Sequence, residues 1–157
     1  MRVGQGFDVH RFSSDKRKPL VLGGVVIEGE GGLIGHSDAD VVTHALCDAL
    51  LGAAGLGDMG THFPDTNPAL EGADSLSLLA KTVKMVAEGG WEPINADLTV
   101  LAERPRIAPH AQRMASILSG IVGAQVSVKA TRPEGLGSLG RAEGIAVLAI
   151  ALLGPIK

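Results

Sequence analysis

Residues 40–54 read DVVTHALCDALLGAA, and this stretch decides the fold. Its apolar side chains, Val41, Ala45 and Leu51 among them, recur at helical spacing, which predicts a helix from about Asp40 to Ala54. An aspartate at position 38 or 40 would cap the start of this helix, and glycines at 55 and 57 would end it. Apolar residues cover most of its circumference, so we expect it to be buried on more than one face.

The segments around this helix show strand and helix patterns in turn. We expect strands at 2–9, 20–22, 25–27, 96–101, 125–130 and 144–153, further helices at 74–86 and 107–121, and loops at 29–35 and 60–72. No linker or internal repeat divides residues 1–157. The sequence therefore predicts a single α+β domain, with a mixed four- to five-stranded sheet and about three helices on one face.

The last expected strand is apolar without alternation, since residues 145–153 read IAVLAIALL. A strand of this kind is buried on both faces. Together with the apolar helix, it predicts a homo-oligomer.

Composition excludes several classes of protein. The 157 residues include 22 Gly, three Phe, one Trp and no Tyr, and 45% are apolar, which is too many for a disordered chain. The glycines have no collagen period, no apolar run is long enough for a membrane span, and no signal-peptide pattern opens the chain. The single Cys47 permits no internal disulfide and favours the cytoplasm, and a net charge of −3 gives no reason to expect nucleic acid.

Three side chains could hold a metal ion. Asp8 and His10 lie two residues apart on an expected strand, so both point to one side of it, and His44 lies in the long helix. One carboxylate and two imidazoles suit Zn²⁺ or a similar divalent ion, and three protein ligands with an open position are typical of catalytic sites. The alternative is an ordinary Asp-x-His pair and a helix histidine without a metal.

Two further segments could bind anions. The sequence HSDAD at 36–40 precedes the long helix, where main-chain N–H groups attract anions, although it could also be only a helix cap. The sequence GDMGTHFPDT at 57–66 is a long loop. It is either a functional loop or one whose Gly and Pro residues serve only to form turns.

Two segments carry arginines. One is AERPR at 102–106, and the other is KATRPEGLG at 129–137, followed by Arg141. The second combines Thr131, Arg132, Glu134 and Arg141, and a hydroxyl, a carboxylate and two guanidiniums are groups that bind a diphosphate with its divalent ion. Each segment could instead be an exposed polar turn. Combined with the Asp/His/His set, however, they favour diphosphate chemistry.

The motifs GFDVH (6–10), GHSDAD (35–40), THALCDALLGAA (43–54), GDMG (57–60) and FPDT (63–66) follow one another in this chain. In order and spacing, over nearly the whole sequence, they resemble the 2-C-methyl-D-erythritol 2,4-cyclodiphosphate synthase family of the non-mevalonate isoprenoid pathway. The resemblance implies a homotrimer with active sites between subunits. It also implies a phosphorus–oxygen lyase that converts 4-CDP-2-C-methyl-D-erythritol 2-phosphate to the 2,4-cyclodiphosphate and releases CMP.

The resemblance also assigns site residues. Asp8, His10 and His44 would bind Zn²⁺, with a substrate phosphate in the fourth position, and Glu134 would bind a second divalent ion, Mg²⁺ or Mn²⁺. The methylerythritol phosphate would be held by His36, Ser37, Asp58, Met59, Gly60, Phe63, Pro64, Asp65, Thr66 and Asn67. The cytidine pocket would comprise Ala102, Glu103, Arg104, Pro105, Arg106, Ile107 and Ala108. The diphosphate would contact Thr131, Arg132, Pro133 and Glu134, and Arg141 completes the substrate-binding set.

The sequence departs from the family pattern at three positions. Ala39 stands where Gly is usual, Ser138 stands where Phe is common, and Arg132 replaces the second of two threonines, the one assigned to transition-state stabilisation. We expect Arg132 to supply a cation in place of that hydroxyl, with Thr131 as the alternative donor. A phosphate nucleophile is already ionised near neutral pH, so His36 is expected to stabilise charge and not to act as a base.

Two other classes of protein are alternatives to an enzyme. One is a non-catalytic trimeric module of the same fold that binds a nucleotide or an isoprenoid. The other is a structural zinc domain, in which Cys47 is the only thiol available as a fourth ligand.

Overall fold

The computed structural model describes residues 1–157 and contains two sheets. The large sheet has the order β1-β6-β4-β5 and consists of β1 (Arg2–Arg11), β6 (Gly144–Pro155), β4 (Trp91–Leu101) and β5 (Gln125–Thr131). Only β4 and β5 run parallel, so the sheet is mixed, as the sequence predicted. The small sheet is an antiparallel hairpin of β2 (Pro19–Leu22) and β3 (Val25–Gly31).

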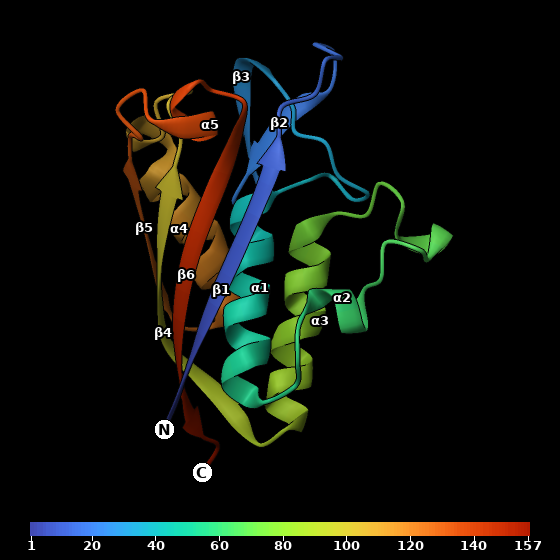
Figure 1. The fold of residues 1–157 in the computed structure, drawn as a ribbon. Coiled ribbons are helices and arrows are strands. Elements are labelled where there is room, and N and C mark those ends of the chain that lie inside the picture. The colour runs from blue at the N-terminus through green and yellow to red at the C-terminus, as the bar shows by residue number, and fades with distance from the viewer.

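Three long helices cover one face of the large sheet (Figure 1). They are α1 (Val41–Ala54), α3 (Ser75–Glu88) and α4 (Ala108–Val122). Helix α1 packs on β1 and β6, α4 packs on β5, and α3 lies against α1. This arrangement confirms the predicted α+β class. No helix combines the length and apolar character that a membrane crossing needs.

Helix α1 is covered inside its own chain. Eleven of its 14 residues are buried, because the sheet lies on one side of it and α3 lies on the other. Its apolar circumference is thus explained without a partner subunit. This corrects one of the two sequence arguments for an oligomer.

Asp40 fixes the start of α1 and ties it to the β2–β3 hairpin. Its fully buried carboxylate accepts hydrogen bonds from the main-chain N–H groups of Val42 and Thr43 at the helix start, and from Gly23 and Gly24 in the hairpin turn. Burial raises the pKa of Asp40, and these bonds oppose that rise. One side chain thereby caps the helix and holds the small sheet beside it.

Two glycines of β1 let α1 approach the sheet closely. A Cβ atom added at Gly6 would lie 1.9 Å from the carbonyl oxygen of Ala45, and one at Gly4 would lie 2.1 Å from that of Ala49. Both contacts are with helix backbone, which cannot move aside without displacing the helix. The Gly-x-Gly spacing on β1 therefore sets the distance between this strand and α1.

The opposite face of the sheet carries no helix and is apolar over β1 and β6 (Figure 1). Phe7 pairs with Leu148 across the two strands, and their side chains are 54% and 39% exposed. Val3, Val9 and Ile150 are exposed as well. We call these five residues the open face. Strand β6 lacks sequence alternation because one of its sides meets the helices and the other belongs to the open face.

The structure differs from the sequence prediction mainly at element ends. Strand β4 begins at Trp91, five residues earlier than expected, because β6 is long enough to pair with it past an irregularity between Pro93 and Asn95. Strand β3 extends to Gly31, into the expected loop. Three short helices were not predicted: α2 (Met59–His62), the 3₁₀ helix η1 (Pro68–Leu70) and α5 (Gly137–Gly140).

The close approach of β1 and α1 predicts that Gly6→Ala destabilises the protein by about 2–4 kcal/mol, because the new methyl group meets backbone. Gly120→Ala is the control, since a Cβ there meets nothing within 4 Å, and alanine in a helix is stabilising by up to about 1 kcal/mol. Urea unfolding of both variants measures the difference. Equal stabilities for the two variants would contradict this account of the packing.

Candidate metal centre and adjoining pocket

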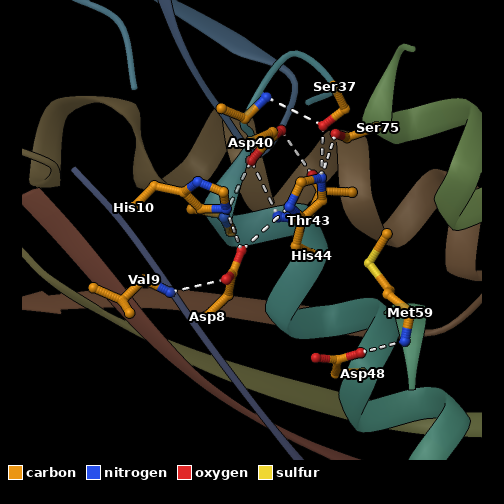
Figure 2. Close-up of polar contacts among 12 residues, drawn as sticks. Asp8, Val9, His10, Ser37, Asp40, Thr43, His44, Asp48, Met59 and Ser75 are labelled. Carbon is orange, nitrogen blue, oxygen red and sulfur yellow. Dashed lines mark hydrogen bonds and ion pairs between the residues drawn. The ribbon is translucent and has the colours of Figure 1, made fainter. Parts of the chain in front are cut away.

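Asp8, His10 and His44 converge where β1 passes the first turn of α1 (Figure 2). The Oδ2 atom of Asp8 lies 2.9 Å from Nε2 of His10 and 3.2 Å from Nδ1 of His44. One potential ligand atom from each residue lies within 4.8 Å of the others. The predicted juxtaposition of these three residues is therefore confirmed.

The other ring nitrogen of each histidine lies within hydrogen-bond distance of an oxygen atom. Nδ1 of His10 lies 2.5 Å from the carbonyl oxygen of Ile34, and Nε2 of His44 lies 2.8 Å from Oγ of Ser75 and 3.1 Å from Oγ of Ser37. Metal-binding histidines are held in this way in proteins, with the second nitrogen donating to an oxygen. The donor set and its surroundings therefore fit a divalent metal ion.

The charges of this cluster depend on one another. Burial alone would raise the pKa of Asp8, but hydrogen bonds from His10 and His44 outweigh it and hold the pKa of this carboxyl well below its usual range. The hydrogen bond to Asp8 raises the pKa of His10, although burial opposes the shift. A carboxylate is therefore available at the cluster throughout the neutral pH range.

The cluster opens into a cavity of about 560 Å³ between α1 and the segment that contains α2. Ten residues predicted for metal or phosphate binding line this cavity besides His44: Asp8, His10, His36, Ser37, Met59, Gly60, Phe63, Pro64, Asp65 and Thr66. Asp58 and Asn67 flank it as helix caps, and Nε2 of His36 lies 3.1 Å from the carbonyl oxygen of Asn67. The structure thus brings together the metal cluster and the segment expected to hold a phosphate.

Asp48 is a cavity residue that the sequence analysis missed. Its carboxylate accepts a hydrogen bond of 2.8 Å from the N–H of Met59, and burial raises its pKa. Asp48 follows His44 by four residues, so both lie on the same face of α1. The four-residue spacing between His44 and Asp48 was the sequence feature that could have identified Asp48 as a cavity residue.

Most of the other predicted residues follow the ends of β4, an internal strand, and of β5, the edge strand farthest from β1. The N–H of Ala102 donates to the carbonyl oxygen of Thr131 at 3.2 Å, which joins the segments 102–108 and 131–134. We call these two segments the nucleotide edge. Strands β1 and β5 are three strand spacings apart, about 14 Å. None of the nucleotide edge lines the cavity at the metal cluster.

Ion pairs hold the nucleotide edge. The guanidinium of Arg132 lies 2.6 Å from Oε1 of Glu103, and this hydrogen bond lowers the pKa of Glu103. Arg104 lies 2.7 Å from Glu30 on β3 and stacks over Phe12. Both arginines thereby brace the 102–106 turn.

Arg141 and Cys47 have surroundings that the sequence did not indicate. Arg141 pairs with Glu143 and does not share a carboxylate with Arg132, but its neighbour Gly140 packs against Gly135, next to the 131–134 segment. Cys47 is fully buried in the core, burial raises its pKa to about 12, and it is not part of the Asp/His/His group. No closed four-ligand centre forms around this thiol, which disfavours a structural zinc domain.

The mixed sheet with three potential metal ligands at the mouth of a cavity defines a class of protein, a small α+β domain with a candidate site for a divalent ion. Residues 1–154 match the model of the YgbB family, and the chain belongs to that family.

Relatives of this chain share one enzyme name. The 2-C-methyl-D-erythritol 2,4-cyclodiphosphate synthase of Symbiobacterium thermophilum is 54% identical over 156 residues, which is 98% of both chains. A bifunctional enzyme IspD/IspF of Anaeromyxobacter dehalogenans is 56% identical over 154 residues, but the match spans only 39% of that longer protein.

Solved structures show the same fold. The bifunctional IspDF of Campylobacter jejuni matches with a TM-score of 0.94 and 43% identity, over 99% of this chain and 42% of that one. IspF of Plasmodium falciparum, described as a CDP complex, matches with a TM-score of 0.85 and 32% identity, over 99% and 97% of the two chains.

The shifted pKa values predict how the stability of the metal-free protein depends on pH. The raised pKa of His10 contributes stability that is fully present below about pH 6.5 and is lost as the pH rises through the folded-state value. The lowered pKa of Asp8 contributes stability above about pH 3.9, which is lost in acid. Urea unfolding in the presence of a chelator should therefore give a lower free energy of unfolding at pH 8 than at pH 6.

Asp8→Asn should abolish this decline between pH 6 and pH 8, because it removes the partner that raises the pKa of His10. Asp15→Asn is the matched control, since Asp15 pairs only with the exposed Arg17. A decline that persists unchanged in Asp8→Asn would show that another group causes it.

Proposed function

We propose that this chain is a cyclodiphosphate synthase, a phosphorus–oxygen lyase of isoprenoid precursor biosynthesis. Its substrate is 4-CDP-2-C-methyl-D-erythritol 2-phosphate, and its products are 2-C-methyl-D-erythritol 2,4-cyclodiphosphate and CMP. The observation that carries the proposal is the Asp8/His10/His44 cluster at the mouth of a cavity lined by the expected phosphate-binding segment. The names of relatives that match nearly the whole chain support the same activity.

The reaction joins two anions, so neutralising charge is the main task of the site. An oxygen of the 2-phosphate forms a bond to the β-phosphorus, and the bond from that phosphorus to the oxygen shared with CMP breaks, so that CMP leaves with this oxygen. Divalent ions held at Asp8, His10 and His44 and at Glu134 would supply Lewis acidity to the phosphoryl oxygens. No proton is abstracted, because the attacking phosphate is already ionised.

The metal cluster and its cavity would bind one part of the substrate. Asp8, His10 and His44 would hold Zn²⁺, and His36 would donate to the developing charge from the cavity wall. The adjoining segments at 36–37 and 58–67 would hold the methylerythritol phosphate. Main-chain N–H groups in these segments can donate hydrogen bonds to a phosphate, and they carry no net charge of their own.

The nucleotide edge would bind the other part of the substrate. The segment 102–108 would take the cytidine, and Thr131 to Glu134 would contact the diphosphate. Glu134 would bind the second divalent ion, Mg²⁺ or Mn²⁺, and Arg141 would add positive charge. Arg132 uses one guanidinium nitrogen on Glu103, which leaves its other N–H groups for the diphosphate.

The separation of these two regions argues for sites shared between subunits. In one chain, the two segments of the nucleotide edge follow strands that lie two and three spacings from β1, about 10 and 14 Å, and neither segment lines the cavity at the metal cluster. A neighbouring copy can bring its nucleotide edge to this chain's metal cluster. The open face, with Phe7, Leu148 and Ile150 exposed, is an apolar surface for this association.

We infer that the assembly is a homotrimer of one-domain chains, located in the cytoplasm. A continuous core of 31 buried residues supports a single domain. A ring of three copies would form three equivalent sites. The relatives' shared enzyme name disfavours a non-catalytic module of the same fold.

The activity predicts CMP release when the purified protein is given the CDP-linked substrate with Zn²⁺ and Mg²⁺. ³¹P NMR should show loss of the substrate diphosphate signals and the appearance of CMP and of a cyclic diphosphate. Asp8→Asn should lower turnover by about 100-fold or more, because a metal ligand is lost. Asp15→Asn, a substitution at an exposed residue, serves as the control. Absence of product with the wild-type protein would refute the proposed activity.

Shared sites predict that two inactive variants complement each other. Asp8→Asn removes a metal ligand, and Glu134→Lys reverses a charge at the exposed nucleotide edge. Each variant alone should be nearly inactive. Unfolding and refolding an equal mixture should restore about one quarter of wild-type activity, because a shared site then has an intact metal half and an intact nucleotide half in about one quarter of random pairings. No recovery in assembled mixtures would place the whole site within one chain.

A further inference from the structure

Nε2 of His44 lies beside Oγ of Ser75 (Figure 2), and Ser75 in turn donates to the carboxylate of Asp38. We propose that Asp38 and Ser75 are positioning residues, which fix the protonated nitrogen of His44 so that its Nδ1 lone pair faces the metal position. This inference rests on the metal-binding role in the proposed function. It concerns how one ligand is held. The sequence assigned neither residue to the metal or the substrate, although Asp38 lies in the 36–40 segment that could bind an anion.

The direction of each hydrogen bond follows from the number of protons available. The Ser75 hydroxyl has one proton and donates it to Oδ1 of Asp38, because a carboxylate only accepts. Oγ of Ser75 can then only accept from Nε2 of His44, which lies 2.8 Å away. With a metal ion bound, a neutral imidazole that keeps its proton on Nε2 would offer its lone pair on Nδ1. Nδ1 is the nitrogen that lies 3.2 Å from Asp8, to which it donates in the metal-free protein, so the metal would replace the Nδ1 proton and leave the proton on Nε2.

Ser37 does not impose the same direction. Its Oγ lies 3.1 Å from Nε2 of His44 and accepts a hydrogen bond from the N–H of Ala39, but its hydroxyl proton has no fixed acceptor. The Ser37 hydroxyl can therefore turn to donate or to accept. Only Ser75 has its proton committed elsewhere, so Ser75 determines the tautomer of His44.

The surroundings hold Asp38 and Ser75 in place. Ser75 is the first residue of α3 and is fully buried, and its main-chain N–H donates to Oδ2 of Asp38 at 3.0 Å. The N–H of Asp40 donates to Oδ1 of Asp38 at 3.2 Å. Both oxygens of Asp38 are therefore engaged, and the carboxylate cannot rotate away from Ser75.

His10 and His44 depend on different kinds of support. The second nitrogen of His10 meets a main-chain carbonyl, that of Ile34, which no side-chain substitution removes. The second nitrogen of His44 meets only side-chain hydroxyls. The support of His44 therefore depends on two side chains in series, because Asp38 fixes the Ser75 hydroxyl and Ser75 in turn fixes the imidazole.

The first test measures zinc affinity by competition with a chromophoric chelator at fixed pH. Ser75→Ala should weaken zinc binding by about 10- to 100-fold, the range typical for losing such a partner. Asp38→Asn should weaken it by a smaller factor, because the amide oxygen still accepts from Ser75 but carries no charge. Ser77→Ala is the matched control, since Ser77 makes the same kind of cap contact on α3 with Asp74 and does not touch His44.

The second test observes His44 directly in the zinc-loaded protein by NMR with ¹⁵N-labelled histidine. The wild-type protein should show zinc on Nδ1 and a slowly exchanging proton on Nε2. That proton should exchange with water faster in Ser75→Ala. A loss of packing alone would not change its exchange selectively.

Three results would overturn the proposal. These are zinc affinities of Ser75→Ala and Asp38→Asn that equal that of Ser77→Ala, an unchanged Nε2 proton in Ser75→Ala, or zinc bound through Nε2 in the wild type. If Ser75→Ala does not fold, Asp38→Asn and the wild-type spectrum decide. Wild-type protein that binds no zinc would refute the metal centre itself, whereas normal zinc binding and turnover with unaffected variants would refute only the positioning role.

Discussion

The close contact between β1 and α1 is the constraint on which the site depends. Gly6 lies against the carbonyl oxygen of Ala45, with no room for a Cβ atom between strand and helix. Asp8 lies two residues further along β1, and His44 precedes Ala45 on α1. A wider separation of the two elements would therefore move the carboxylate away from the imidazole. The same packing that excludes a side chain at Gly6 also brings two metal ligands together.

Buried polar groups keep this contact in register. Asp40 is fully buried, but its four main-chain donors and the Thr43 hydroxyl compensate for the cost of removing a carboxylate from water. Ser75 is also fully buried and bonded on both sides. The helix starts of α1 and α3 are thus fixed by hydrogen bonds of defined direction, whereas apolar packing alone would let them slide.

The sequence predicts this fold well wherever local patterns decide the structure. The helical spacing of residues 40–54, the cap at Asp40 and the stop at Gly55 are all confirmed. Strand ends were predicted less well, because pairing with β6 extends β4 through Glu92 and Pro93, which have low strand propensity. Pairing between distant segments is not visible in a local pattern.

The same distinction applies to the site. The Asp/His/His cluster was predictable, because two of its members share a strand and the third lies on the strongest helix. The contact of Ser75 with His44 joins residues 31 positions apart, and nothing in the neighbouring sequence indicates it. Likewise, the motif at 131–134 gave no indication that it ends the strand farthest from β1, since strand order depends on the topology of the whole sheet.

The shared site that we propose, with the metal cluster of one chain facing the nucleotide edge of another, has a thermodynamic consequence. A ligand that contacts both regions would bind only to associated chains, so its binding free energy would add to that of association. Apparent affinity for such a ligand then rises with protein concentration, and the ligand in turn protects the assembly against dilution. A compound that fills only the cavity beside Asp8 lacks this coupling and binds a separate chain as well as an assembled one.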